Sequence, residues 1–160
     1  MKAPKRPIKK PLRLPIQKVY KIQGIGQVCT GRIEAGVLKP GMKLISAPNG
    51  YECTVGTIEM FKEQVDEALP GDNVGVVFKG LHKDIKIKGG EVFGDAEFPP
   101  KIVNEFSAQI VIMRHPTGIK VNYTPVLDLH TIHMASKFIK FVSKIDRKTG
   151  EVIEENPTVL

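Results

Sequence analysis

The feature that most constrains this chain is the regular spacing of its turn sequences. From Leu14 to Gly94, turns built on glycine or proline recur every 6–12 residues. The segments between them are short and rich in β-branched residues: "QVCTGRI", "MKLIS", "YECTVGTIEM", "NVGVVFK" and "EVF". Short strands at this spacing are typical of antiparallel barrels and sandwiches, so we predict an all-β fold. Within it, "APNGYECTV" predicts a hairpin, because Asn-Gly accepts the positive φ angles of a type I′ turn.

A second set of strand-like segments follows Pro99-Pro100, which predicts a domain boundary near residue 99. These segments are "NEFSAQIVIMRH", "YTPVLDLHTIHMASKFIKFVSKI" and "DRKTGEVI". One stretch differs from the others: Phe138, Phe141, Val142 and Ile145 have the i, i+3, i+4, i+7 spacing of an amphipathic helix. Periodicity alone therefore predicts one short helix in a chain of strands and turns.

Basic charge is concentrated at the N-terminus. The formal net charge of the chain is +7, and residues 1–15 hold six lysines and arginines and no acid. Four prolines in the same stretch disfavour both helix and central strand, so the arm is predicted to be an extended linker. Its charge suits contact with RNA phosphates. A solvated linker between domains explains the composition equally well.

Several classes of protein are disfavoured by what the sequence lacks. No apolar run approaches the roughly 18–20 residues of a membrane span, and the basic N-terminus lacks the apolar segment of a signal peptide. Cys29 and Cys53 have no metal or disulfide spacing, which predicts buried free thiols in a reducing cytosol. The GxG at Gly24 and Gly26 precedes a strand-like segment, and no GxxxxGK[ST] occurs, so no nucleotide-phosphate loop is expected.

Catalytic and metal-binding patterns are also weak. His130 and His133 of "HTIH" are candidate metal ligands, but in a strand their odd offset sends the two rings to opposite faces. No third ligand lies near them in sequence. No serine, cysteine or threonine lies in a recognisable nucleophile elbow. We therefore expect no metal, no cofactor and no enzymatic activity in this chain.

Several sequence motifs occur together in a diagnostic order. The stretch "KPLRLPIQKVYKIQGIGQVCTGRIEAGVLKPGMKL", followed by "IEM", "ALPGDNVG" and "VLDLHT", closely resembles translation elongation factor 1-alpha, the eukaryotic and archaeal counterpart of bacterial elongation factor Tu. The resemblance runs from about Pro4 to the end of the chain. Three segments, "FSAQIVIMRHP", "YTPVLDLHT" and "KIDRKTGE", resemble the eukaryotic branch in particular.

The resemblance implies a domain organisation. Residues 1–13 correspond to the linker from an N-terminal GTPase domain, residues 14–97 to the second domain, an antiparallel β-barrel, and residues 100–160 to the first half of the third-domain barrel. We expect this last part to form strands but no closed barrel, with an open edge that favours pairing with another chain. The resemblance also implies a strand over residues 132–145, which we prefer to the helix because tertiary context often overrides a short pattern.

The resemblance further implies a function. Members of the family deliver aminoacyl-tRNA to the ribosomal A site in a GTP-dependent manner, and the second domain holds the aminoacylated 3′ end. GTP and Mg²⁺ would belong to the GTPase domain, which this chain lacks. The implied partners are aminoacyl-tRNA, the ribosome, a guanine-nucleotide exchange factor and the GTPase domain, with no membrane, in the cytoplasm.

By the same resemblance, five residues bind the terminal adenosine. Ile22, Gly24 and Val28 line the side on which the adenine packs, and Val77 completes the apolar wall. Glu59 packs beside the adenine and accepts a hydrogen bond from the terminal ribose. An apolar surface for a base and an acceptor for a ribose hydroxyl are what recognition of a single-stranded RNA end requires. Without the resemblance, strand valines and isoleucines are more often core residues.

Three further residues complete the site that the resemblance implies. The backbone at Phe61 and at Asn73 of "GDNVG" would surround the aminoacyl group, and Lys62 is a further residue that binds the tRNA 3′ end. Phe61 and Lys62 stand where the family usually has His- or Arg-like residues. "GQVC" likewise replaces a more usual "GTVP"-like stretch.

The sequence leaves two alternatives to an elongation factor open. One is the barrel part of a related release or ribosome-rescue GTPase, which need not bind an aminoacyl end. The other is a stand-alone β-barrel module that binds RNA or protein. The intact "IEM" and "GDNVG" sequences favour the elongation factor.

Overall fold

The computed structural model describes residues 5–82 and 84–160. The chain divides into two compact units, one formed by residues 1–104 with His130–Ile132 and the other by Glu105–Leu129 with His133–Leu160. Among the described residues every regular element is a strand, and there is no helix. The predicted all-β class is therefore confirmed.

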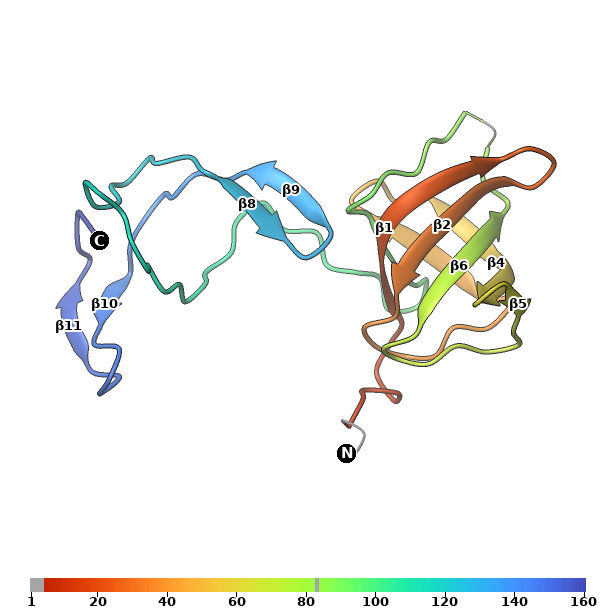
Figure 1. Ribbon diagram of the computed structural model, residues 1–160, viewed down its shortest axis with the longest axis horizontal. Coiled ribbons are helices and arrows are strands. Elements are labelled where there is room, and N and C mark those ends of the chain that lie inside the picture. Colours follow the sequence, from red (N-terminus) through yellow and green to blue (C-terminus); the bar gives the residue numbers. More distant parts are fainter. Residues whose placement is uncertain (1–4, 83) are drawn as a thin grey trace. The chain divides into compact units, whose positions relative to one another are not determined.

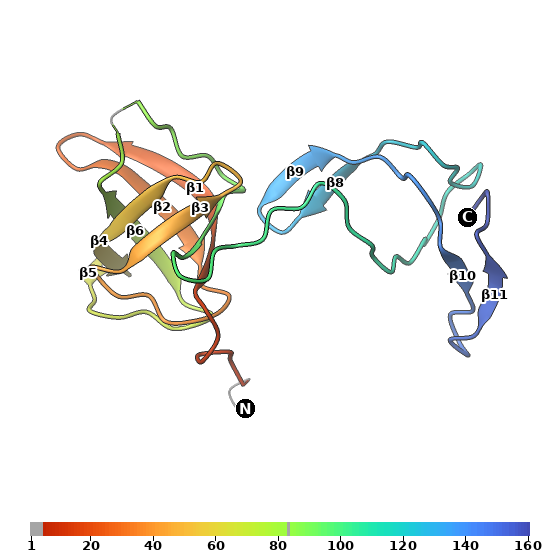
Figure 2. The same ribbon diagram turned by 180° about the vertical axis from the view of Figure 1, so that it is seen from behind.

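Six strands of the first unit close into an antiparallel β-barrel (Figure 1). The order along the sheet is β3-β7-β1-β2-β6-β4-β5, and β3 pairs with β4 as well as with β7, which closes the barrel. The view from behind shows β3 beside β4 (Figure 2). The strands are β1 (Arg13–Ile22), β2 (Gly26–Arg32), β3 (Lys43–Ala47), β4 (Glu52–Met60), the short β5 (Glu63–Gln64), β6 (Asn73–Lys79) and β7 (Val92–Asp95).

Alternate residues of these strands fill the barrel interior. Ile16 of β1, Cys29 of β2 and Val76 of β6 are fully buried. Phe93 of β7 is also fully buried and stacks on Phe78, with ring centroids 4.4 Å apart. The residues between them point outward, because successive side chains of a strand lie on opposite faces. The same core includes Leu12, Leu14, Ile33, Leu38, Leu44, Cys53, Val55, Ile58, Ala68, Val74 and Ile87.

Two hairpin turns differ from expectation. The β3–β4 hairpin forms, but Gly50 is its residue with positive φ, at 73°, and the Gly50 N–H donates to the Ser46 carbonyl at 2.8 Å. Asn49 keeps a negative φ, so the predicted type I′ turn is wrong. Two consecutive residues with positive φ occur instead between β4 and β5, where Phe61 and Lys62 have φ angles of 51° and 71°. Bulky residues rarely adopt this region, and no Asn-Gly signal marks the turn.

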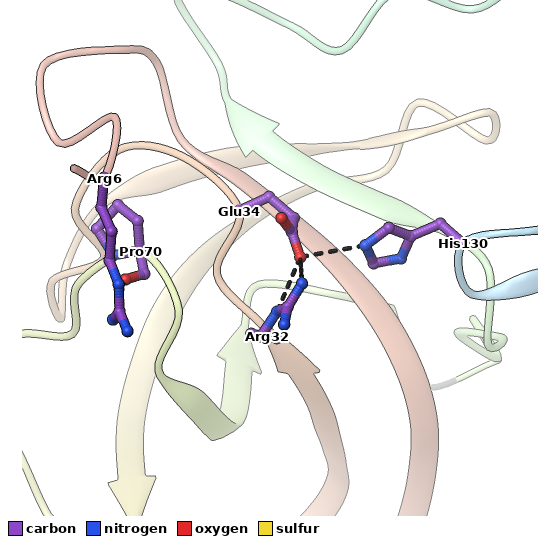
Figure 3. A network of polar contacts seen from close by, with 5 residues as sticks. All are labelled: Arg6, Arg32, Glu34, Pro70 and His130. Carbon is purple, nitrogen blue, oxygen red and sulfur yellow. Dashed lines mark hydrogen bonds and ion pairs between the residues drawn. The ribbon is translucent and has the colours of Figure 1, made fainter. Parts of the chain in front are cut away.

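The described part of the N-terminal arm packs against the barrel. Arg6 lies beside Pro70 (Figure 3), and Arg6 Nη1 donates a hydrogen bond to the Pro70 carbonyl at 2.6 Å. The Gly36 N–H donates to the Pro7 carbonyl at 3.0 Å, and Leu12 is buried. Residues 5–12 contain no strand, as their prolines predict, but these contacts are not those of a fully solvated linker. The first four residues of the arm lie outside the described part.

The C-terminal part of the chain forms two separate two-stranded sheets. One pairs β8 (Val126–Leu129) with β9 (Ile132–Ala135), and the other pairs β10 (Ser143–Ile145) with β11 (Val152–Glu155). They do not close into a barrel within residues 105–160, as expected.

The predicted strand over residues 104–115 is wrong, since that segment pairs with no described strand. The predicted helix and the continuous strand over 132–145 are both wrong, because strands occupy only the ends of that segment.

Packing in this second unit is sparse. Phe138 stacks on Tyr123 with centroids 6.3 Å apart, and Phe141 is buried beside it. Many other large apolar side chains are exposed, including Phe106, Val111, Met113, Val126, Ile139, Val142 and Ile153. Isolated two-stranded sheets are only marginally stable in water. The barrel is therefore the part of the chain with a complete core.

The two thiols give a test of the barrel core. Burial raises the pKa of Cys29 and of Cys53 from 9.0 to about 12, and the nearby Glu91 carboxylate adds to the effect at Cys29. A thiol-specific disulfide reagent at pH 8 is expected to leave both unmodified in the folded chain and to modify both in denaturant. The neutral thiols stabilise the fold below pH 9, and this stability declines as the pH rises from 9 towards 12. Rapid modification of the folded chain would contradict the buried placement.

Candidate nucleic-acid interface

Strands β1, β2, β6 and β4 are successive neighbours in the barrel sheet (Figure 1). Residues directly opposed across antiparallel strands point to the same face. Tyr20 of β1 is opposed to Val28 of β2, which is opposed to Val77 of β6. Their neighbours Cys29 and Val76 are buried in the core. The row of Tyr20, Val28 and Val77 therefore faces outward.

A second outward row lies two residues further along the strands. It runs from Lys18 through Thr30 and Gly75 to Glu59, each directly opposed to the next. Gly75 has no side chain, and a Cβ built there would lie 3.6 Å from Val28 Cγ1 and 4.0 Å from the Glu59 carbonyl oxygen. The surface is therefore lowest at Gly75, between the Val28 side chain and the strand that carries Glu59. We call these two rows the outward face.

Three of the predicted residues lie at its margins. Ile22 is two positions after Tyr20 and shares its side of β1. Asn73 is two positions before Gly75 on β6 and shares that side. Gly24 lies in the loop between β1 and β2 with a φ of 83°, and nothing lies within 4 Å of a Cβ built there. Glycine therefore suits this position because of its positive φ angle, although a side chain would have enough space there.

Phe61 and Lys62 form the turn that follows β4. Because Glu59 is opposed to Gly75, this turn lies at the same end of the sheet as Asn73. The Phe61 side chain is 96% exposed. The structure thus places the turn beside the outward face, with a large aromatic side chain directed to solvent.

The Glu59 carboxylate is exposed, and no ion pair between described residues involves it. A structural ion pair with Lys62 is therefore absent. Glu34 provides a contrast, because Arg32 donates to its Oε1 through Nε at 3.0 Å and through Nη2 at 2.8 Å (Figure 3). That hydrogen bonding holds the pKa of Glu34 below its usual value. Among the described residues Glu59 has no such partner, so its carboxylate can accept a hydrogen bond from a ligand.

A hollow lies beside the outward face. It has a volume of about 500 Å³ and opens at the end of the β1–β2 hairpin. Its wall includes Ile22 and Val77, but not Glu59 or Asn73. The Gln27 side chain spans it, donating to the Ile85 carbonyl at 2.7 Å and accepting from the Ile87 N–H at 3.2 Å. A terminal nucleoside needs an apolar surface for its base and an acceptor for its ribose hydroxyl. The outward face offers both, with the Glu59 carboxylate as the acceptor, and Glu59 does not line this hollow.

Metal ligands are not gathered in the described part of the chain. It contains no group of three or more His, Cys, Asp or Glu side chains able to hold a metal ion. His130 lies in the turn between β8 and β9, and His133 Nδ1 contacts Asp128 Oδ1.

Within residues 5–82 and 84–160, no helix is long and apolar enough to span a membrane.

Part of the outward face was not predicted from the sequence. Lys18 and Tyr20 precede Ile22 at alternate positions of β1, and this spacing of two could have identified them. Thr30 follows Val28 by the same interval. Gly75 belongs to "GDNVG" and forms the low point only because the register sets it between Thr30 and Glu59.

Family models match both parts of the chain. Residues 26–94 match "Elongation factor Tu domain 2", and residues 105–160 match "GTP-eEF1A C-terminal domain-like". Between them the two models cover most of the sequence. Among solved structures, sup35 complexed with GMPPNP has a TM-score of 0.87 at 27% identity, over 100% of this chain and 38% of that one. Translation elongation factor SelB from Methanococcus maripaludis has a TM-score of 0.52 at 31% identity, over 58% of this chain and 20% of that one.

Curated relatives agree with these matches. Elongation factor 1-alpha of Blastocystis hominis is 49% identical over 98% of this chain, and that of Tetrahymena pyriformis is 52% identical over 98%. The protein of the same name from Methanocaldococcus jannaschii is 48% identical over 98%. The chain spans only 36% of the length of each of these three relatives. It therefore belongs to the elongation factor 1-alpha family, with a second-domain barrel followed by a segment of the C-terminal domain.

Proposed function

We propose that the barrel binds the aminoacylated 3′ end of tRNA, as part of a factor that delivers aminoacyl-tRNA to the ribosomal A site in a GTP-dependent manner. The observation that carries the proposal is the outward face, on which Val28, Val77 and Glu59 surround the low point at Gly75. The sequence holds no P-loop. GTP and Mg²⁺ would therefore be bound by a GTPase domain elsewhere in such a factor.

The chemistry of the face suits a terminal adenosine. The partly buried Val28 and Val77, with the exposed Ile22 beside them, offer an apolar surface on which a base can pack. The Glu59 carboxylate, which pairs with no cation among the described residues, is an acceptor for a ribose hydroxyl, and hydrogen bonds to a charged group are stronger than neutral ones. The β4–β5 turn and Asn73 lie beside Glu59, where an aminoacyl group attached to the same ribose would extend.

Other partners follow from the same proposal. A factor of this kind would bind the ribosome and a guanine-nucleotide exchange factor and would work in the cytoplasm. The family membership supports these assignments.

Titration of aminoacylated and uncharged tRNA into the chain tests the proposal. We expect the charged tRNA to bind at least about tenfold more tightly, because only it fills the space beside the β4–β5 turn. Amide chemical shifts measured by NMR on the ¹⁵N-labelled chain detect the binding and locate it. Equal affinity for the two tRNAs would indicate a general RNA-binding module. Binding of neither would favour a barrel of the release or rescue type.

A further inference from the structure

We propose that Tyr20 and Lys18 form a second subsite on the outward face, which binds the nucleotide on the 5′ side of the terminal adenosine. The Tyr20 ring stacks on its base, and the Lys18 ammonium pairs with the phosphate that joins it to the adenosine. This inference rests on the proposed function, because the adenosine site at Val28, Val77 and Glu59 fixes the position of the RNA end.

The position of Tyr20 makes it continuous with the adenosine site. Tyr20 is directly opposed to Val28, which is opposed to Val77. With strands about 4.8 Å apart, Tyr20 Cα lies about 10 Å from Val77 Cα along this row. A base on Val28 and Val77 thus leaves the Tyr20 ring within reach of the adjoining nucleotide.

The environment of Tyr20 leaves its ring available. The side chain is 50% exposed and stacks on no other aromatic ring of the described residues. β7 pairs with β1 only at Arg13–Pro15, so this part of β1 has β2 as its one strand neighbour among the described strands. Aromatic side chains at such open positions are the usual stacking surfaces for single-stranded bases.

The charges along the second row set the direction of the RNA. Lys18 stands at one end and Glu59 at the other, three strand spacings or about 14 Å apart. No ion pair between described residues involves Lys18. A phosphate is repelled at Glu59 and attracted at Lys18, while a ribose hydroxyl is accepted at Glu59. The 3′ terminus therefore lies at β4, and the chain runs towards β1 in the 5′ direction.

Two stable ligands separate the subsite from the adenosine site. One is adenosine with an amide-linked amino acid on its 3′ position, and the other is the cytidylyl-adenosine dinucleotide with the same group. Their affinities for the 160-residue chain are measured by NMR titration, which detects weak binding. The dinucleotide is expected to bind about five- to a hundredfold more tightly than the nucleoside, the range typical of one base stacked on an aromatic ring.

Variants of Tyr20 test the stacking. Tyr20→Ala is expected to abolish most of the gain from the second nucleotide and to leave the affinity for the nucleoside unchanged. Tyr20→Phe keeps the ring and should keep the gain. If Tyr20→Ala retains the gain, or weakens both ligands equally, the subsite is wrong. If the wild-type chain does not bind the nucleoside at all, the proposed function fails, and the inference fails with it.

Two lysines on the same strand test the phosphate contact. Lys18→Ala is expected to make dinucleotide binding less dependent on salt, since one phosphate contact is lost. Lys21 is the matched control, because it is opposed to Gln27 and points to the other side of β1. Lys21→Ala should leave the salt dependence unchanged. Equal effects of the two substitutions would indicate general attraction of RNA by positive charge and would contradict the assignment of Lys18.

Discussion

Replacing Glu59 by alanine is expected to weaken binding of aminoacyl-tRNA about tenfold to a hundredfold. A hydrogen bond to a charged group contributes about 1.5–3 kcal/mol, and the alanine side chain cannot accept one. The melting temperature should barely change, because the carboxylate is exposed and forms no ion pair with a described residue. Affinity and melting temperature are measured on the same preparations by equilibrium titration and by thermal unfolding.

Two variants serve as controls for Glu59→Ala. Glu59→Gln keeps the shape and one acceptor oxygen but removes the charge, so its loss of affinity should be smaller. Glu63→Ala removes an exposed carboxylate from the same hairpin, but Glu63 is opposed to Met60 and lies on the other side of the strand pair. It should leave affinity unchanged. Unchanged affinity in Glu59→Ala, or equal losses in Glu59→Ala and Glu63→Ala, would remove Glu59 from the site.

Replacing Phe93 by alanine is expected to lower the free energy of unfolding of the barrel by about 3–5 kcal/mol. The Phe93 side chain is fully buried in β7, the strand that joins β1 to β3, and it stacks on Phe78. Its removal leaves a cavity and ends that stacking. Loss of this size is a large part of the stability of a typical domain. Urea titration followed by the reactivity of Cys29 and Cys53 reports the unfolding of the barrel specifically.

Phe98 provides the matched control for Phe93. Its side chain is 58% exposed, and its carbonyl accepts a hydrogen bond from Arg13 Nη1 at 2.9 Å, a contact that alanine retains. Phe98→Ala should therefore change the free energy of unfolding by less than about 0.5 kcal/mol. Similar losses for the two substitutions would show that Phe93 does not fill the core as described.

Much of the barrel follows from local sequence. The strands β2, β3, β4, β6 and β7 coincide with segments rich in β-branched residues, because alternating apolar residues and frequent turns determine where such strands begin and end. The turn at Phe61 and Lys62 could not be predicted in this way. Its positive φ angles are adopted by residues that disfavour them, so the pairing of β4 with β5 imposes them.

The C-terminal part was harder to predict, because a strand requires a partner as well as a suitable sequence. Residues 104–115 alternate apolar and polar side chains but pair with no described strand. Around Phe138 and Phe141, the helix predicted from the periodicity and the strand expected from the resemblance were both wrong, because this stretch forms neither. Aromatic contacts with Tyr123 organise that stretch instead.

The candidate site could be predicted only in part. Ile22, Val28, Val77 and Glu59 were assigned from the resemblance, while their residue types alone favoured burial for the first three. The register of β1, β2, β6 and β4 brings them to one face, which no local pattern contains. Lys18 and Tyr20 were not among the predicted residues, and the same register places them on this face.

The most direct test of the central claim is a double-mutant cycle between Glu59 and the terminal ribose. Wild-type and Glu59→Ala chains are titrated with aminoacyl-adenosine analogues that either carry or lack the free ribose hydroxyl, and the four affinities give a coupling free energy. If Glu59 accepts a hydrogen bond from that hydroxyl, the loss caused by Glu59→Ala should largely vanish with the deoxy ligand, for a coupling of about 1 kcal/mol or more. If the two losses are simply additive, Glu59 does not bind the ribose, and the assignment of the outward face to the tRNA end is contradicted.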